Sequence, residues 1–417
     1  MNCYNRFKEL RIKFRKVMIY CFFKGLFKIF KTMGLYKKVY NDNVLVVDQQ
    51  IIGDSVMVSI IFENIGRGLQ PKNIIDILCC NEPVQEIYRR NKFINKIFTI
   101  DRFAVAMKKS KLSIFHSKTI YGIFYGLYCA YFSFKNLRNK YKTLIVPIYK
   151  TDTIYTAIIA LMSGIEDRYS FSEKNFKDKS VTTFWWDKYF TRTFLYNISC
   201  NECEKFLYLI KAIGYKIIQE KISLKYKKLD DVFFYEKSMG RIKSLRGGIV
   251  SIAVDVSVPT REWSIDNFVR IAEFVYELGY MPVFIGTRLN YYNYINSIDC
   301  LKKKSINLIG KTTLSEVIDV IGNSKLYIGC DTGLSHIAAG VDVYGIVIFA
   351  NSKEEDASDV TSSIRMRPYS DKITVVQPEH SVMPCDGICK ENYAHCINSV
   401  SVENVENVVL DIVNKYL

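Results

Sequence analysis

The chain has 417 residues, of which 49% are hydrophobic and 24% are charged, and its formal net charge is +16. This length is too great for one hydrophobic core and predicts two domains. The apolar content excludes a disordered polymer, and no run reaches the roughly 20 uncharged apolar residues that a membrane-spanning helix needs.

The positive charge is concentrated at the N-terminus. Residues 1–38 contain eleven basic residues and one acidic residue, so this segment carries +10 of the total of +16. The remaining +6 is spread over the rest of the chain, which argues against a diffuse nucleic-acid-binding surface. No secretory signal is evident, because lysines interrupt the first apolar run.

Residues 1–38 are predicted to form a basic amphipathic helix that ends near Gly34. On a helical wheel the apolar face comprises Ile19, Phe22, Leu26, Ile29, Phe30 and Met33. The opposite face comprises Lys24, Lys28 and Lys31. This pattern is typical of a helix lying in the interface of an anionic membrane. The alternative is a helix docked on the domain with solvated lysines.

Residues 42–228 are predicted to form a Rossmann-like domain, since short apolar runs alternate with helical stretches. The expected strands are Val44–Val47, Ile75–Cys79, Ile97–Ile100 and Thr143–Pro147. The uncharged aromatic segment Thr119–Phe134 lies before the last of them. It is too short to span a bilayer, and we expect a buried helix with one aromatic edge near the membrane.

A second alternating series fills residues 245–417, after a charged connection near residues 225–243. The expected strands are Ile249–Val254, Met281–Ile285, Ile306–Ile309, Leu326–Ile328 and Gly345–Phe349. The expected helices are Asp266–Leu278, Thr313–Ile321 and a final one from Val402 to Tyr416, with Ser401 as its N-cap. The chain is therefore predicted to be an α/β protein of two Rossmann-like domains facing a cleft.

The most specific motif is Asp-Thr-Gly-Leu-Ser-His at residues 331–336. It joins an apolar run to a run of small residues, which predicts a strand, a turn and the start of a helix. Free N–H groups and the helix dipole make such a junction suitable for holding a phosphate. The alternative is an ordinary turn in which Asp331 and Thr332 only cap the helix.

Two upstream motifs strengthen the first interpretation. Arg261-Glu-Trp263 follows a predicted strand, and Gly310-Lys-Thr-Thr-Leu314 opens a predicted helix. This order resembles glycosyltransferase family 9, the ADP-heptose:lipopolysaccharide heptosyltransferases and their relatives, over roughly residues 42 to 415. The resemblance implies a GT-B fold, with the acceptor on the N-terminal domain and the nucleotide-sugar on the C-terminal one.

The resemblance also implies roles for particular residues. Asp54, after the flexible Gly53, matches the catalytic base of an inverting transfer; a helix-capping aspartate is the alternative. The implied donor-binding residues are Ser257, Arg261, Thr312, Asp331, Thr332, Gly333 and His336. Side chains and a helix dipole would hold the diphosphate, so neither a catalytic metal nor a cofactor is expected.

Two departures fall on the donor side. Relatives often carry a glutamate for the ribose after the position of Gly286, where this chain has Thr287-Arg288. The usual Gly-Pro-Thr after the last strand is replaced by Ala350-Asn-Ser352. Both changes put ADP-heptose in doubt as the donor and leave the moved sugar open, as a heptose or a related hexose.

The cysteines indicate a reducing compartment, because most of the twelve lie in apolar contexts. The exception is Cys385, Cys389 and Cys396, with His395 adjacent. A zinc site is one interpretation, but the spacing is not a standard one. A structural role in this turn-rich tail is favoured over a catalytic one.

The predicted function is sugar transfer from a nucleotide-sugar to a lipopolysaccharide or lipooligosaccharide core or another surface glycan. The enzyme would lie on the cytoplasmic face of the inner membrane, held by the anionic surface. Alternatives are a catalytically silent GT-B scaffold and a GT-B nucleotide-sugar epimerase or hydrolase. A dinucleotide-dependent oxidoreductase is disfavoured, because the glycine fingerprint G-x-G-x-x-G is absent from both first strand–helix turns.

Overall fold

The chain forms two compact units in a computed structural model. The structure describes residues 3–100, 118–147, 154–175, 186–237, 247–359, 361–386 and 390–417. Unit 1 comprises Met1–Gln50, Ile61–Ile198 and Lys205–Gln219, and unit 2 comprises Ile51–Ile60, Ser199–Glu204 and Glu220–Leu417. A short segment around residue 54 therefore packs with unit 2, although the strand before it belongs to unit 1. The domain boundaries 42–228 and 245–417 stay a prediction.

Unit 1 is built on a parallel sheet with the strand order β3-β2-β1-β4-β5-β6. The strands are β1 (Val44–Asp48), β2 (Ile75–Cys79), β3 (Ile94–Thr99), β4 (Thr143–Val146), β5 (Asp167–Phe171) and β6 (Arg192–Phe194). The first four were expected from their apolar runs. The last two were not predicted, because they are short, polar and partly exposed, so they lack the apolar run typical of a central strand.

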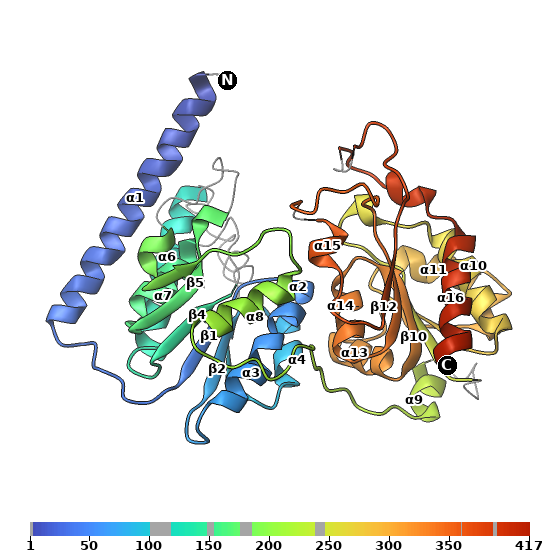
Figure 1. Ribbon diagram of the computed structural model, residues 1–417, viewed down its shortest axis with the longest axis horizontal. Coiled ribbons are helices and arrows are strands. Elements are labelled where there is room, and N and C mark those ends of the chain that lie inside the picture. The colour runs from blue at the N-terminus through green and yellow to red at the C-terminus, as the bar shows by residue number, and fades with distance from the viewer. Residues whose placement is uncertain are drawn as a thin grey trace. The chain divides into compact units, whose positions relative to one another are not determined.

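Helices cover both faces of this sheet (Figure 1). One face carries α1 (Cys3–Thr32), α6 (Lys118–Asn136) and α7 (Ile154–Met162), and the other carries α3 (Ile60–Gly68), α4 (Glu82–Arg89) and α8 (Glu202–Ala212). None of the helices in the described ranges is both long enough and apolar enough to cross a bilayer.

Helix α1 is docked on unit 1 along its C-terminal half. Tyr20 and Phe23 are buried, and the rings of Phe30 and Phe134 lie 4.9 Å apart between centroids. Part of the predicted apolar face points away from unit 1, since Phe22, one of its members, is 57% exposed. The packed face is rotated because aromatic residues outside the predicted stripe find partners in α6 and η3 (Trp186–Tyr189).

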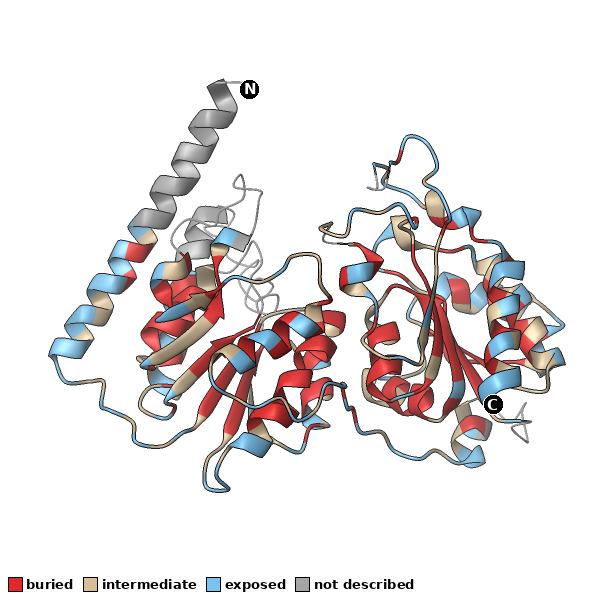
Figure 2. Cartoon of the chain, in the orientation of Figure 1, coloured by how far each residue is buried: buried red, intermediate tan, exposed pale blue. Residues whose placement is uncertain are grey.

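Unit 2 repeats the topology of unit 1, with the strand order β12-β11-β10-β7-β8-β9. The strands are β7 (Ile249–Ala253), β8 (Met281–Ile285), β9 (Ile306–Asn307), β10 (Ser324–Cys330), β11 (Tyr344–Ile348) and β12 (Ile373–Val376). Numbered within its own unit, each sheet runs 3-2-1-4-5-6, which is the Rossmann order. The central strands of both sheets are buried (Figure 2).

Helices cover both faces of this sheet as well (Figure 1). One face carries α10 (Ile265–Glu277), α11 (Leu289–Ser297) and α16 (Val402–Tyr416), and the other carries α13 (Leu314–Gly322) and α14 (Gly333–Gly340). Shorter helices are α2 (Ile52–Val58), α9 (Asp231–Lys237), α12 (Leu301–Lys304) and α15 (Ser363–Met366). The expected cap of α16 is confirmed, because the Ser401 hydroxyl accepts the Asn404 amide at 3.1 Å.

Candidate functional site

The candidate site lies at the carboxyl edge of the unit 2 sheet, where the strand order reverses. Strands β7 and β10 are neighbours, and the chain moves outward from them in opposite directions. Arg261 ends the short turn η4 (Pro259–Arg261) after β7, and Asp331 directly follows β10. Their side chains form an ion pair across this switch point, with 2.7 Å between Nη1 and Oδ2. Ligands of open α/β sheets bind at such a point.

The Asp331 carboxylate sits in an environment that disfavours its charge. Its side chain is 4% exposed, and burial raises the pKa of Asp331 to about 6. The Arg261 guanidinium opposes this shift, while the nearby Asp54 carboxylate adds to it. Arg261 is a quarter exposed. Asp331 therefore orients Arg261, and the rest of the guanidinium fork is left to meet an anion.

The N-terminus of α14 completes this edge. Thr332 has an extended backbone, and its N–H donates to the Ser335 hydroxyl at 3.2 Å. The same hydroxyl donates to the Thr332 carbonyl at 2.6 Å, which fixes the first turn. The amides of the first turn of a helix have no partner within the helix, and the dipole favours negative charge there.

Two glycines allow α2 to approach α14 within unit 2. A Cβ atom on Gly333 would lie 2.8 Å from Ile52 Cγ2, and a Cβ atom on Gly53 would lie 3.1 Å from His336 Cδ2. Side chains at either position would force the two helices apart. This contact brings Asp54, in the first turn of α2, next to the start of α14.

His336 is buried in the first turns of α14, with 2% of the residue exposed. Burial, and to a smaller extent the Arg261 charge, lowers the pKa of His336 to about 4. The imidazole is therefore neutral at pH 7 and acts through hydrogen bonds instead of charge. Its Nδ1 atom is buried and has no hydrogen-bond partner among the described residues. Such an atom marks a place for a ligand or water.

The structure thus brings together six of the eight predicted residues: Asp54, Arg261, Asp331, Thr332, Gly333 and His336. Ser257 is exposed, just before η4. Thr312 follows Gly310, whose φ of +70° needs a glycine, and the Thr312 hydroxyl is buried without a partner in the described chain. In the part of the chain that the structure describes, no recorded contact joins Ser257 or Thr312 to the ion pair.

A polar network beside the ion pair was not predicted. Asp255, directly after the buried end of β7, accepts the Thr287 hydroxyl at 2.8 Å and the Arg288 amide at 3.0 Å. Arg288 in turn pairs with Glu262 at 2.8 Å and donates to the Val256 carbonyl at 2.6 Å. Thr287 and Arg288 are the residues at which the sequence departs from the expected family pattern. The sequence did contain a signal for this network, namely the carboxylate of Asp255 shortly after a central strand.

The family model for glycosyltransferase family 9 (heptosyltransferase) matches residues 133–394, more than half of the chain. The chain belongs to glycosyltransferase family 9. The family expected from the order of the motifs is therefore confirmed, and membership classes the chain as a glycosyltransferase.

Three solved structures share the fold. The family 9 protein of Veillonella parvula has a TM-score of 0.66 at 15% identity and covers 91% of this chain and 99% of its own. The E. coli ADP-heptose lps heptosyltransferase II has a TM-score of 0.63 at 13% identity, covering 89% and 99%. E. coli heptosyltransferase WaaC with ADP has a TM-score of 0.62 at 13% identity, covering 88% and 99%. The expected α/β architecture of GT-B type is confirmed.

One curated relative is similar in sequence over a shorter stretch. The lipooligosaccharide heptosyltransferase 2 of Haemophilus influenzae is 28% identical over 123 residues. The match spans 28% of this chain and 33% of that relative. This match therefore does not assign the substrates or partners of the present chain.

Proposed function

We propose that this chain is an inverting, metal-independent glycosyltransferase. It would move a heptose or a related hexose from a nucleotide-diphosphate donor to a lipopolysaccharide or lipooligosaccharide core, or to another surface glycan. The observation that carries the proposal is the Arg261–Asp331 ion pair at the switch point of unit 2, with buried His336 and Asp54 beside it. The names of the similar proteins supply the substrate classes.

The donor diphosphate would be bound by groups with three different properties. Arg261 supplies a positive charge and a planar fork that matches phosphate oxygens. The amides of the first turn of α14, from Gly333 onward, supply the N-terminal donors, and Thr332 caps this turn, its own amide being bonded to Ser335. His336 supplies a neutral imidazole whose Nδ1 lacks a protein partner among the described residues. Together they can stabilise charge that develops on the leaving diphosphate.

The remaining predicted donor residues would act at the edges of this site. Ser257 offers a hydroxyl just before η4, toward a phosphate, and the Thr312 backbone would contact the nucleobase. Asp331 would act through Arg261 by holding its guanidinium in place. No Mg²⁺ is required in this scheme, because side chains and a helix dipole neutralise the diphosphate.

Asp54 would remove the proton from the attacking acceptor hydroxyl. Its place in the first turn of α2 is fixed by the close approach of Gly53 to His336. Its side chain is among the buried charged groups of the protein, so the surroundings limit how the carboxylate can move. A positioned base of this kind suits single-displacement transfer with inversion.

The experiment that tests this function uses the purified full-length protein with ADP-heptose and a truncated lipooligosaccharide, followed by mass spectrometry. We expect a mass increase of one sugar on the acceptor. Release of free sugar without transfer would favour the hydrolase or epimerase alternative. Nucleotide binding with neither outcome, across ADP-, UDP-, GDP- and CMP-sugars, would favour the silent scaffold.

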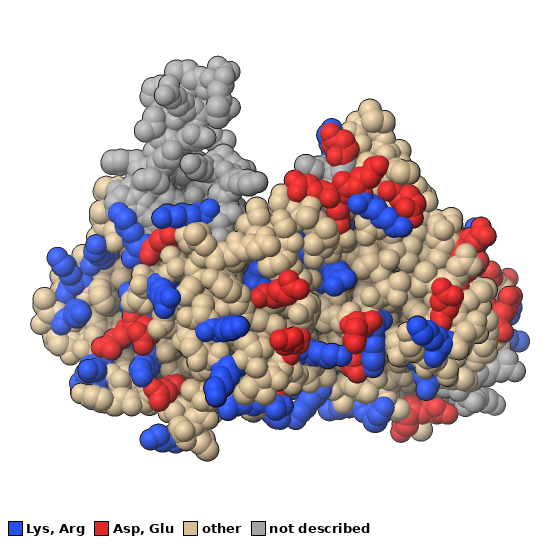
Figure 3. All heavy atoms as spheres, viewed as in Figure 1, with Lys and Arg blue, Asp and Glu red and all other residues tan. Residues whose placement is uncertain are grey.

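Unit 1 would hold the enzyme on the cytoplasmic face of the inner membrane. Helix α6 exposes three aromatic side chains and one leucine: Phe124, Leu127, Tyr128 and Tyr131. Tyr131 is the most exposed of them, at 60%. Helix α1, packed beside it, exposes a second apolar stripe of Met18, Phe22 and Ile29, which continues to Met33 directly after the helix. Basic side chains gather over the C-terminal half of α1 (Figure 3). Apolar side chains beside lysines suit the interface of an anionic bilayer.

A further inference from the structure

The segment that follows β12 is long and irregular. In its described part, between residues 377 and 395, it contains no helix or strand. Polar contacts hold its first part, including a hydrogen bond of 2.7 Å between the hydroxyls of Ser352 and Ser381 and one of 3.0 Å from the Ser381 amide to Glu354. A loop of this length without secondary structure is uncommon in a compact unit, and such loops are usually functional.

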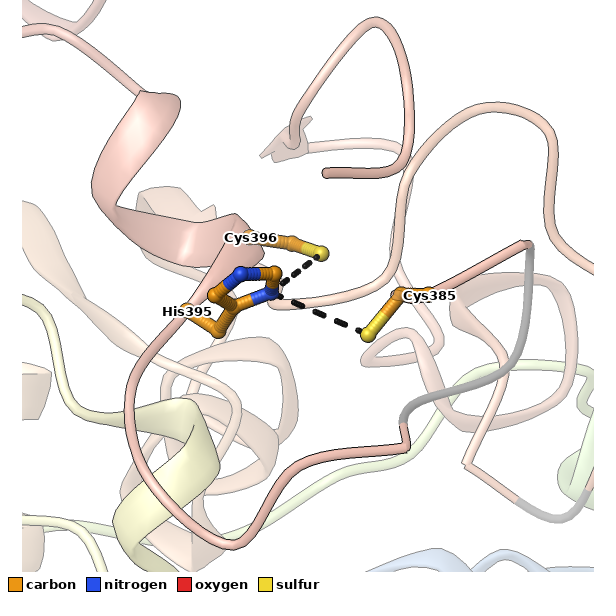
Figure 4. Close-up of side chains that lie close together, drawn as sticks. All are labelled: Cys385, His395 and Cys396. Atoms are coloured by element: carbon orange, nitrogen blue, oxygen red, sulfur yellow. Dashed lines mark hydrogen bonds between the residues drawn. The ribbon is translucent and has the colours of Figure 1, made fainter. Parts of the chain in front are cut away.

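Three soft ligand atoms meet at the end of this segment. Cys385, His395 and Cys396 place two sulfurs and one imidazole nitrogen within 4.8 Å of one another (Figure 4). The His395 Nδ1 atom lies 3.8 Å from Cys385 Sγ and 3.6 Å from Cys396 Sγ. Cys385 is buried, and the other two are partly buried.

The distances fit a tetrahedral metal site. Zn²⁺ binds thiolate sulfur at about 2.3 Å and imidazole nitrogen at about 2.0–2.1 Å, so tetrahedral angles separate sulfur from nitrogen by about 3.6 Å. Both measured S···N distances lie close to this value. The imidazole nitrogen therefore already lies at the separation from each sulfur that a shared zinc ion requires.

Backbone amides are directed at both sulfurs. The Val382 amide donates to Cys396 Sγ at 3.4 Å, and the Lys390 amide donates to Cys385 Sγ at 3.4 Å. Hydrogen bonds from backbone amides orient metal-bound groups and stabilise their negative charge. The Nδ1 atom of His395 faces both sulfurs, so the imidazole is placed to be the third ligand (Figure 4).

We propose that Cys385, His395 and Cys396 bind a divalent transition metal of borderline softness, with Zn²⁺ as the expected ion. Binding replaces two thiol protons, which leave to solvent, by two metal–sulfur bonds, and it adds one metal–nitrogen bond. Two thiolates and an imidazole are the donor set that selects zinc over Mg²⁺ or Ca²⁺. Cys389, the third cysteine of the sequence cluster, lies outside the described residues and is not part of the proposal.

The ion has a structural role on the donor side of unit 2. Cys396 opens the turn η5 (Cys396–Ser399), which leads to Val400. The Val400 carbonyl accepts the indole N–H of Trp263 at 2.9 Å, and Trp263 lies two residues after Arg261. A metal ion that joins Cys385 to Cys396 would therefore fix the start of η5 and, through Val400, the position of Trp263 beside the Arg261 turn.

The test measures metal in the full-length protein, produced with Zn²⁺ in the medium and purified without a metal-affinity tag. We expect about one zinc per chain by mass spectrometry of the metal, and its loss in Cys385→Ser and in His395→Ala. Cys300→Ser is the matched control, because Cys300 is an exposed thiol of the same unit bonded to Glu273. It should retain the metal. Removing zinc from the parent with a chelator should lower its melting temperature.

The rival explanations predict different results. If the two cysteines form a disulfide, two of the twelve thiols of the unfolded chain will fail to react, and no zinc will be found. If they are free thiols bonded to His395, all twelve will react and the metal content will be near zero. Either result overturns the proposal, as does zinc that remains bound in both variants.

A second measurement covers variants that fail to fold. Replacing zinc by Co²⁺ in the parent should produce thiolate-to-cobalt absorption, because the ligands are thiolates. An absence of that absorption in folded parent protein would also overturn the proposal. Neither measurement depends on sugar transfer, so their outcome is independent of the proposed function.

Discussion

Unit 1 and unit 2 share one strand order and differ in where their reactive and apolar groups lie. In unit 2 the carboxyl edge of the sheet gathers buried charged or polar groups, among them Asp331 and His336. In unit 1 the outer helices α1 and α6 leave aromatic side chains exposed, such as Phe22 and Tyr131. A repeated topology thus fixes where a site can form, and the side chains placed on it decide what each unit can bind.

The largest effect should come from Asp54, which separates chemistry from binding. Asp54→Asn keeps the shape of the side chain and removes the base, so turnover should fall by about 10²–10⁴-fold. The affinity for the donor should stay within a few-fold of the parent, because the protein groups proposed to bind the diphosphate are unchanged. Initial-rate kinetics together with calorimetric titration of the donor measure both quantities. Undiminished turnover would remove Asp54 from the mechanism.

The proposed membrane-binding surface of unit 1 should show the next largest effect. Replacing Lys24, Lys28 and Lys31 by Gln removes three exposed charges, each contributing about 1 kcal/mol near an anionic bilayer. Binding to phosphatidylglycerol vesicles should weaken by roughly 100-fold at low salt and less at high salt. Co-sedimentation measures this. The matched control is the triple Gln variant of the surface helix α12, at Lys302, Lys303 and Lys304.

Deleting residues 1–38 is a poorer test of the same surface. Tyr20 and Phe23 belong to the hydrophobic core of unit 1, so the deletion would expose their partners on α6 and α7. Loss of vesicle binding in such a protein would report damaged packing as well as lost charge. If the triple variant of α1 sediments with vesicles as well as the control, α1 is a structural helix.

The smallest effect concerns His336 and pH. The folded protein holds this imidazole neutral, since its pKa is lowered to about 4, while the unfolded chain protonates near pH 6.5. The stability that depends on the neutral form is therefore complete above pH 6.5 and is lost as pH falls toward 4, by up to about 3 kcal/mol. The melting temperature of the parent should fall relative to His336→Gln between pH 7 and pH 5.

Asp331 titrates in the same range with the opposite sign. Its pKa is raised to about 6, so its protonation on acidification favours the folded state. Because Asp331 is present in both proteins, the difference between the parent and His336→Gln isolates the histidine. A difference that does not change with pH would show that His336 has an ordinary pKa.

The fold and the family could be predicted because they depend on features that repeat along the chain. Central strands such as β2 and β8 are continuous apolar runs, and the motif at residues 331–336 marks one specific turn. The edge strand β6 escaped prediction because three partly exposed residues carry no such signal. Local sequence thus identifies elements whose burial is nearly complete.

The sequence could indicate the candidate residues of the site but not the contacts between them. The sequence indicated Arg261 and Asp331 separately, but their ion pair depends on two strands 70 residues apart becoming neighbours. The orientation of α1 depended on aromatic partners in other helices, which a helical wheel does not contain. The Asp255–Arg288 network likewise joins the ends of two strands.

The central claim is that the switch point of unit 2 binds a nucleotide diphosphate through Arg261. The direct measurement is calorimetric titration of Arg261→Ala with whichever of ADP, UDP or GDP stabilises the parent most. Loss of a charge-assisted contact should weaken binding by roughly 10- to 100-fold, and Arg261→Lys should recover part of it. Arg270→Ala, which removes an exposed arginine of α10, should bind like the parent. Equal affinity for Arg261→Ala and Arg270→Ala, in proteins with intact melting transitions, would contradict the account.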